Sequence, residues 1–114
     1  MSSLTASLAH FAEAYRSNRK LVAEQRGWTK VVALVASDSG EAAAVLLEDG
    51  DVAGIEAGRR VGDIVVTADL ATLRDILELR SSPNEPYLFG ELTVNGLEAD
   101  FLRLDYIASV LCPT

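Results

Sequence analysis

The chain has 114 residues, of which 49% are hydrophobic and 6% aromatic, and its formal net charge is −7. This length is typical of one domain with a single core. The negative charge argues against a protein that binds a nucleic-acid backbone, because such binding requires clustered Lys and Arg.

Residues 3–26 are predicted to form one long amphipathic helix. Its apolar side chains fall on a narrow arc at helical spacing: Leu4, Leu8, Phe11, Tyr15 and Val22. Residues 1–30 hold five basic and two acidic side chains, so this part of the chain is positive while the rest is strongly negative. Its basic flank is compatible with transient contact to an anionic membrane surface or an acidic partner. It is also compatible with a helix that packs on the core and has a solvated polar side.

Three strands are predicted next, at residues 29–37, 41–48 and 51–57. Asp49-Gly50 is a strong signal for a two-residue hairpin turn between the last two of them, so together they should form an antiparallel meander. Ala42-Ala43-Ala44 is unusual inside a strand. The small side chains either leave room for a ligand above the sheet or allow a helix to pack closely there.

The second half mixes strands and helices. Ile64-Val65-Val66 predicts a short buried strand at residues 63–68, and Asp69 is placed to cap a leucine-rich helix at residues 70–80. Pro83 should end that helix. The elements expected after it are a short helical turn at 84–89, a strand at 91–95 and a helix at 97–111.

The last helix carries more apolar surface than one core contact uses. One stripe contains Leu97, Phe101, Leu104, Ala108 and Leu111. A second stripe, on roughly the opposite side, contains Leu102, Tyr106 and Val110. A helix that is apolar on two sides must cover both. The second stripe therefore predicts contact with another helix, a bound apolar chain or a second subunit.

The order of these elements resembles the sterol carrier protein type two family, in the form of a bacterial-type stand-alone domain. The resemblance covers roughly residues 29–111, and its specific part is an acidic cap and leucine-rich helix followed by a proline, an aromatic segment, Gly-x-Leu-x-Val-x-Gly and an amphipathic helix. The residues that carry it are Asp69, Leu73, Ile76, Pro83, Phe89, Gly90, Leu92, Val94, Gly96 and Leu104.

The resemblance implies an α/β domain of the α+β type, with a five-stranded, mostly antiparallel sheet and helices on one face. It also implies an internal apolar tunnel for a fatty acyl chain, a sterol-like molecule or an isoprenoid. We expect this cavity between the sheet and the helices at 70–80 and 97–111, closed at one end by Leu88-Phe89, with Arg103 or the first helix available to a head group. The candidate ligand-binding residues are Leu73, Leu77, Leu88, Phe89, Phe101, Leu104, Tyr106 and Val110.

The sequence contains few residues that could form a catalytic site. Its only histidine is His10, on the polar side of the first helix, and its only cysteine is Cys112, at the end of an apolar helix. These two residues form no familiar metal-ligand set, and there is no phosphate-binding glycine loop. We therefore expect no catalytic residue, no metal and no cofactor.

The expected function is non-catalytic binding or transfer of an apolar lipid. The alternative is an interaction module that uses the surplus apolar helix face to form a homodimer or to dock an enzyme. The single cysteine is typical of a reducing compartment, and the sequence contains neither an apolar run of about 20 residues nor a signal peptide. We therefore expect a cytoplasmic protein.

Overall fold

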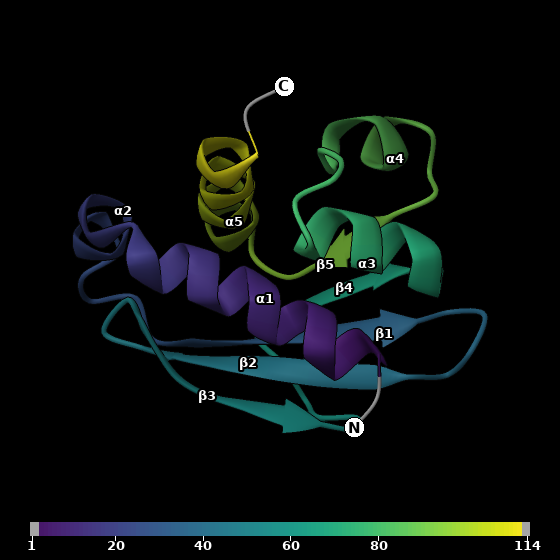
Figure 1. Cartoon of the computed structure of the whole chain (residues 1–114), viewed down its shortest axis with the longest axis horizontal. Helices are drawn as coiled ribbons and strands as arrows, with labels where there is room; N and C mark the ends of the chain where they lie inside the picture. Colours follow the sequence, from purple (N-terminus) through teal and green to yellow (C-terminus); the bar gives the residue numbers. More distant parts are fainter. Residues whose placement is uncertain (1–2, 113–114) are drawn as a thin grey trace.

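The computed structural model describes residues 3–112, and its five strands form one mixed sheet (Figure 1). The strands are β1 (Lys30–Ala36), β2 (Ala42–Glu48), β3 (Asp51–Ala57), β4 (Ile64–Ala68) and β5 (Thr93–Asn95), in the order β3-β2-β1-β4-β5. Neighbouring strands are antiparallel except for β1 and β4, which are parallel. The predicted α+β fold with a mostly antiparallel five-stranded sheet is confirmed.

The meander β1-β2-β3 forms as its turns predict. Asp49 and Gly50 have φ angles of 51° and 84°, which is the geometry of a two-residue hairpin turn with both central residues left-handed. A Cβ at position 50 would also lie only 2.5 Å from the carbonyl oxygen of Gln25. Glycine is therefore required here both by the backbone conformation and by the close approach of the chain after α2.

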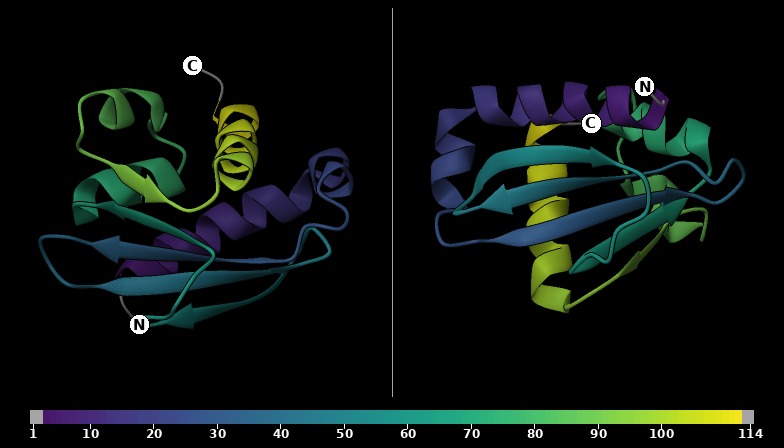
Figure 2. Two further views of the ribbon diagram at one scale, coloured as in Figure 1. Left: turned by 180° about the vertical axis from the view of Figure 1, so that it is seen from behind. Right: turned by 90° about the horizontal axis from the view of Figure 1, so that it is seen from below.

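The chain then crosses the sheet from β3 to β4. Residues 58–63 pass over the face opposite the helices (Figure 2), where a Cβ at Gly62 would lie 2.9 Å from the Cβ of Ala33. The N–H of Val31 donates to the Asp63 carboxylate at 2.8 Å, and the N–H of Asp63 donates to the Val31 carbonyl at 2.9 Å. These bonds start the parallel pairing of β1 with β4. This crossover allows β4 to pair with β1 rather than with β3.

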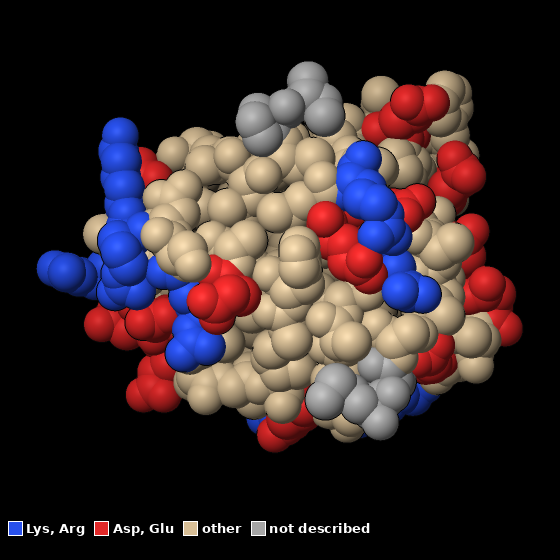
Figure 3. Space-filling model, viewed as in Figure 1, with Lys and Arg blue, Asp and Glu red and all other residues tan. Residues whose placement is uncertain are grey.

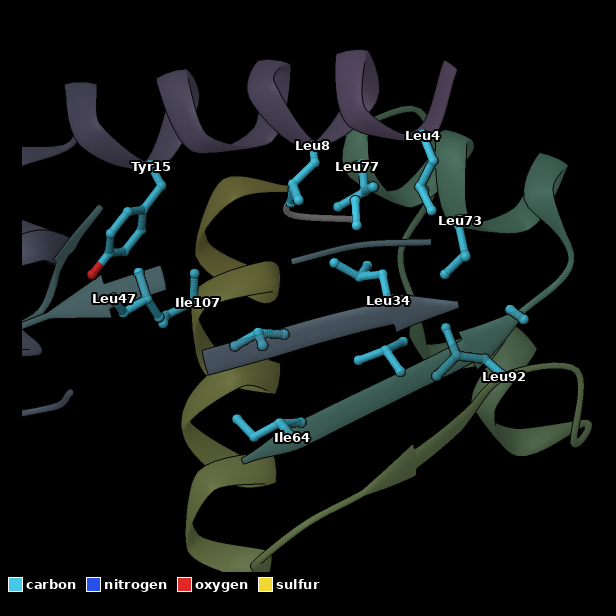
Figure 4. Close-up of a cluster of buried hydrophobic side chains, with 14 of the residues drawn as sticks. Leu4, Leu8, Tyr15, Leu34, Leu47, Ile64, Leu73, Leu77, Leu92 and Ile107 are labelled. Atoms are coloured by element: carbon cyan, nitrogen blue, oxygen red, sulfur yellow. The ribbon is translucent and has the colours of Figure 1, made fainter. Parts of the chain in front are cut away.

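The helices cover the other face. Helices α1 (Ser3–Ser17), α3 (Leu70–Leu77) and α5 (Glu98–Leu111) lie on it side by side, and α2 (Arg19–Glu24) and α4 (Asn84–Leu88) extend this layer (Figures 1 and 2). The core fills the space between the layers, where side chains such as Leu8, Leu73 and Ile107 point toward the sheet (Figure 4).

The prediction of one continuous helix over residues 3–26 is wrong. The chain turns at Asn18, whose φ and ψ angles of −92° and 84° are not helical, and α2 starts afresh from there. The Asn18 side chain accepts a hydrogen bond of 3.1 Å from the N–H of Leu21 and so caps α2. An Asn side chain competes for backbone donors in this way, which makes it more favourable at a helix start than inside a helix.

The boundaries of α3 follow local signals. Asp69 caps the helix as predicted, accepting a hydrogen bond of 2.7 Å from the N–H of Thr72. The helix ends at Leu77 rather than at residue 80, because Leu79 has a φ angle of 62° and cannot continue it. Strand β5 starts at Thr93, two residues later than expected.

Candidate functional site

A cavity of about 470 Å³ lies between the sheet and the helical layer. It falls within the range of small-molecule sites, about 300–1,000 Å³. Its lining comes from α1 (Leu8, Phe11), from the strands (Val32, Leu34, Val45, Val66, Val94), from α3 (Leu73, Ile76, Leu77), from α4 and its flanks (Pro83, Asn84, Tyr87, Leu88, Leu92) and from α5 (Phe101, Leu104, Asp105, Ala108).

The floor of the cavity is a row of cross-strand neighbours. Val45 lies opposite Val32, Leu34 lies opposite Val66, and Val66 lies opposite Val94. Because side chains alternate along a strand, residues paired across strands share one face. The sheet register therefore places five β-branched or leucine side chains under the helices.

The walls are built at helical spacing. Leu73, Ile76 and Leu77 lie on one side of α3, and Phe101, Leu104, Asp105 and Ala108 lie on one side of α5. In Figure 4, Leu73 and Leu77 point from α3 toward the strands, opposite Leu34.

Helix α4 forms the roof. The Tyr87 ring stacks on the Phe101 ring of α5, with centroids 5.1 Å apart and an interplanar angle of 28°. Offset aromatic pairs of this kind stabilise by about 0.5–1.5 kcal/mol. Leu88 lines the cavity although it is 78% exposed. The α4 segment therefore spans the gap between α3 and α5 with only partial burial of its own side chains.

Of the candidate residues, Leu73, Leu77, Leu88, Phe101 and Leu104 line this cavity. Phe89, Tyr106 and Val110 do not, and they are 71%, 46% and 38% exposed. Tyr106 faces α2, where its hydroxyl donates to the Glu24 carboxylate at 3.0 Å. The two stripes of α5 thus have different surroundings, and only the stripe of Phe101 and Leu104 faces the cavity.

Helix α1 and the sheet contribute to the lining although none of the candidate residues lies on them. Phe11 lies on the apolar arc of the first helix and Val45 is an apolar residue of β2, so the sequence contained a burial signal for both. That signal does not distinguish a core residue from a cavity residue. Of the three small residues Ala42–Ala44, none lines the cavity. The space above the sheet comes from the separation of the helices instead.

Two polar joints hold the walls in place, the first at the start of α5. Asp100 is only 6% exposed and accepts a hydrogen bond of 3.0 Å from the Trp28 indole N–H, while Lys30 Nζ lies 3.1 Å from its second oxygen. The Trp28 hydrogen bond, with the nearby Lys30, holds the pKa of Asp100 below its usual value. The carboxylate therefore stays charged and ties α5 to the start of β1.

The second joint connects α1 with α3. The buried Ser7 hydroxyl donates to the Glu78 carboxylate, which also pairs with Arg74 and Arg80. The Ser7 hydrogen bond and then Arg80 lower the pKa of Glu78 from 4.5 to about 2. Like the Asp100 joint, this one lies outside the cavity lining.

Arg103 does not line the cavity. Its guanidinium donates to the Gln25 carboxamide oxygen at 2.8 Å and lies over the Trp28 ring at 5.4 Å from the centroid. It is thus held on the α2 side of α5. The expectation that Arg103 could hold a head group at the mouth of the cavity stays a prediction.

Residues 3–112 contain no group of three His, Cys, Asp or Glu side chains that could hold a metal ion. His10 is exposed on α1, and the partly buried Cys112 sulfur lies 3.7 Å from the Leu79 carbonyl oxygen. On the face seen in Figure 3, Lys and Arg side chains gather over the α2 end with Asp and Glu beside them, and a second strip of Lys and Arg lies to the right of centre. Within the part of the chain that the structure describes, no helix has both the length and the apolar character to cross a membrane.

No known family model matches the sequence, and no curated protein matches it. Solved structures do match the fold. A crystal structure of sterol carrier protein 2 is 22% identical with a TM-score of 0.68, over 96% of this chain and 95% of that one. A Thermus thermophilus protein, whose name suggests a sterol carrier protein, is 24% identical with a TM-score of 0.65, over 96% and 90%. Palmitated SCP2L2 of Aedes aegypti is 22% identical with a TM-score of 0.60, over 97% and 95%.

Proposed function

Because the chain has the fold of a sterol carrier protein 2-like domain, we propose that it binds and transfers an apolar lipid without catalysing a reaction on it. The observation that carries the proposal is the cavity of about 470 Å³, in which Asn84 and Asp105 are the only lining residues within 3–112 that are neither apolar nor aromatic. An apolar space of this size is what an acyl chain, an isoprenoid or a sterol-like molecule would fill.

Burial of hydrocarbon alone can supply the affinity of such a site. Each methylene group removed from water contributes about 0.8 kcal/mol. Ten buried carbons therefore give about 8 kcal/mol before the costs of association and ordering, which leave part of it as affinity. No charged partner is needed for this gain. The proposed contact residues are Leu73, Leu77, Leu88, Phe101 and Leu104; Phe89, Tyr106 and Val110 are left outside the proposed site because they do not line the cavity.

We further propose that lipid is exchanged during transient contact with a membrane surface. Arg16, Arg19, Lys20 and Arg26 are exposed at the corner formed by α1 and α2, in a protein that is otherwise acidic. Anionic lipids attract such a corner by about 1 kcal/mol for each basic side chain near the surface. Binding to vesicles that contain anionic lipid, but not to zwitterionic vesicles, would support this step.

A second candidate function rests on α5. Leu102, Tyr106 and Val110 leave an apolar stripe on its outer side, and Leu97 at its start is also exposed. Exposed apolar patches on a soluble domain often mark protein contacts. In this alternative the domain forms a homodimer or docks an enzyme through the stripe, and the cavity is incidental.

Native mass spectrometry of protein purified without detergent tests both the lipid-carrier function and the interaction-module function. A monomer that carries acyl-chain or isoprenoid mass supports the lipid carrier. A mass that doubles with protein concentration, with no extractable lipid, supports the interaction module. A monomer that neither co-purifies with lipid nor takes up an added apolar probe would contradict both.

A further inference from the structure

Two polar side chains interrupt the hydrocarbon lining of the cavity. Asn84 comes from the first turn of α4, and Asp105 comes from the middle of α5. Apart from the Tyr87 hydroxyl, every other lining side chain consists of carbon and hydrogen only. Among residues 3–112, no Lys, Arg or His lines the cavity.

Asp105 lies on the cavity side of its helix. It shares that side with Phe101, Leu104 and Ala108, at the helical spacing i, i+3, i+4 and i+7. It is partly buried. No donor or cation in the described part of the chain bonds its carboxylate, and the Ser109 hydroxyl donates to the Asp105 backbone carbonyl instead.

Asp100, the buried acid of α5, has different surroundings. One oxygen of Asp100 accepts a hydrogen bond from the Trp28 indole, and the other lies 3.1 Å from Lys30 Nζ in an ion pair. The neighbouring cation Arg103 is committed to Gln25 and the Trp28 ring, away from the cavity. The acid that holds α5 in place is therefore paired with Trp28 and Lys30, whereas residues 3–112 offer no partner to the carboxylate of Asp105.

A carboxylate can only accept hydrogen bonds, so it is satisfied by a ligand that donates one. A ligand carboxylate placed beside it would add a like charge within a lining that is otherwise mostly apolar. With no cation in the lining, nothing there offsets that repulsion. The Asn84 carboxamide both donates and accepts, so it is compatible with a neutral polar head group.

We infer that the cavity selects an apolar chain whose head group donates a hydrogen bond, such as a long-chain alcohol or amine, over a chain that ends in a free carboxylate. Asp105 is the residue that discriminates, and Asn84 at the start of α4 supports the head group. This inference rests on the proposed lipid-binding function.

The test compares ligands that share one chain length. Dodecanol, dodecylamine and dodecanoate are titrated against the protein loaded with the uncharged dye Nile red, below their micelle concentrations, at neutral pH and an ionic strength of about 0.15 M to screen long-range charge effects. The variants are Asp105→Asn, which keeps the shape and removes the charge, and Glu98→Gln. Glu98 is exposed on the same helix and does not line the cavity, so its variant controls for the loss of one negative charge.

We expect dodecanol to displace the dye at concentrations at least about tenfold lower than dodecanoate, because a like-charge contact within a mostly apolar lining readily costs a factor of this size. Asp105→Asn should bring the two ligands to within about threefold by strengthening dodecanoate, and Glu98→Gln should leave the ratio unchanged.

Three results would overturn the inference. Equal or tighter binding of dodecanoate to the parent protein refutes it while leaving the lipid-binding function intact, and this comparison does not depend on any variant being folded. A ratio that shifts equally in Asp105→Asn and Glu98→Gln assigns the effect to net charge rather than to the cavity. Failure of Nile red and of all three ligands to bind would refute the proposed function itself.

Discussion

Replacing Ala108 with leucine should make the protein more stable and a weaker lipid binder at the same time. Ala108 is 8% exposed and lines the cavity from α5, so a larger side chain there enters empty space rather than packed atoms. Leucine adds three carbons, and burying them contributes up to about 2.4 kcal/mol at about 0.8 kcal/mol each. Cavity-filling changes in practice yield about 0.5–2 kcal/mol, and leucine is nearly as good a helix former as alanine.

The same three carbons would occupy space that ligand methylenes need. If three methylenes lose their place, the affinity falls by about 2.4 kcal/mol, or roughly fiftyfold. Urea unfolding measures the first effect, and displacement of Nile red by dodecanol measures the second. The expected rise in stability and fall in affinity distinguish cavity filling from damage to the fold, because a damaged variant would lose both stability and affinity.

Ala99→Leu is the matched control, since Ala99 is exposed on the same helix and does not line the cavity. It should change stability by less than about 0.5 kcal/mol and leave binding unaltered. Destabilisation of Ala108→Leu by about 1–3 kcal/mol would mean that the site is already packed. Unchanged dodecanol affinity in a folded, stabilised variant would mean that the ligand binds elsewhere.

Three further predictions concern the site and its supports. Leu77→Arg places a cation in the apolar wall and should abolish Nile red binding; a thermal melt must show that the variant is folded, and a folded variant with parental binding would contradict the proposed site. The depressed pKa of Glu78, about 2 instead of 4.5, contributes stability that is present above pH 4.5 and lost as the pH falls toward 2. Ser7→Ala should therefore lose less stability than the parent over that interval in urea titrations, and identical slopes would show that the joint is not coupled to folding. Asn18→Ala removes the α2 cap and should cost about 1 kcal/mol in urea unfolding; an unchanged or raised unfolding free energy would show that the break in the helix does not depend on the cap.

Much of the fold could be predicted because its signals are local. The Asp49-Gly50 turn, the Asp69 cap and the short apolar run at Ile64 each specify their own segment, and the structure follows them. The continuous first helix failed because its apolar arc runs through the break. Asn18 lies among residues at helical spacing, and only its hydrogen bond to Leu21 reveals a cap.

The cavity was harder to predict, because it depends on how far apart elements come to rest. The two stripes of α5 are similar in composition, and the sequence does not say which one faces the sheet. The answer comes from distant partners: Trp28 and Lys30 at Asp100, and Glu24 at Tyr106, determine the rotation of the helix. The structure also places Asp105 in the lining, and no apolar pattern in the sequence would select a charged residue for that position.

The parallel pairing of β1 with β4 has a consequence for folding kinetics. The meander joins residues close in sequence, whereas the pairing of Val32 with Ile64 joins distant parts of the chain. The Ser7–Glu78 and Trp28–Asp100 joints have sequence separations of 71 and 72 residues. Contacts of long sequence separation carry a larger loop-closure cost, so they tend to form late. The walls of the cavity should then assemble after its floor. Mutations in the β1–β2 hairpin would slow folding, whereas mutations at the two joints would mainly speed unfolding, and φ-values near 1 at Asp100 would refute this order.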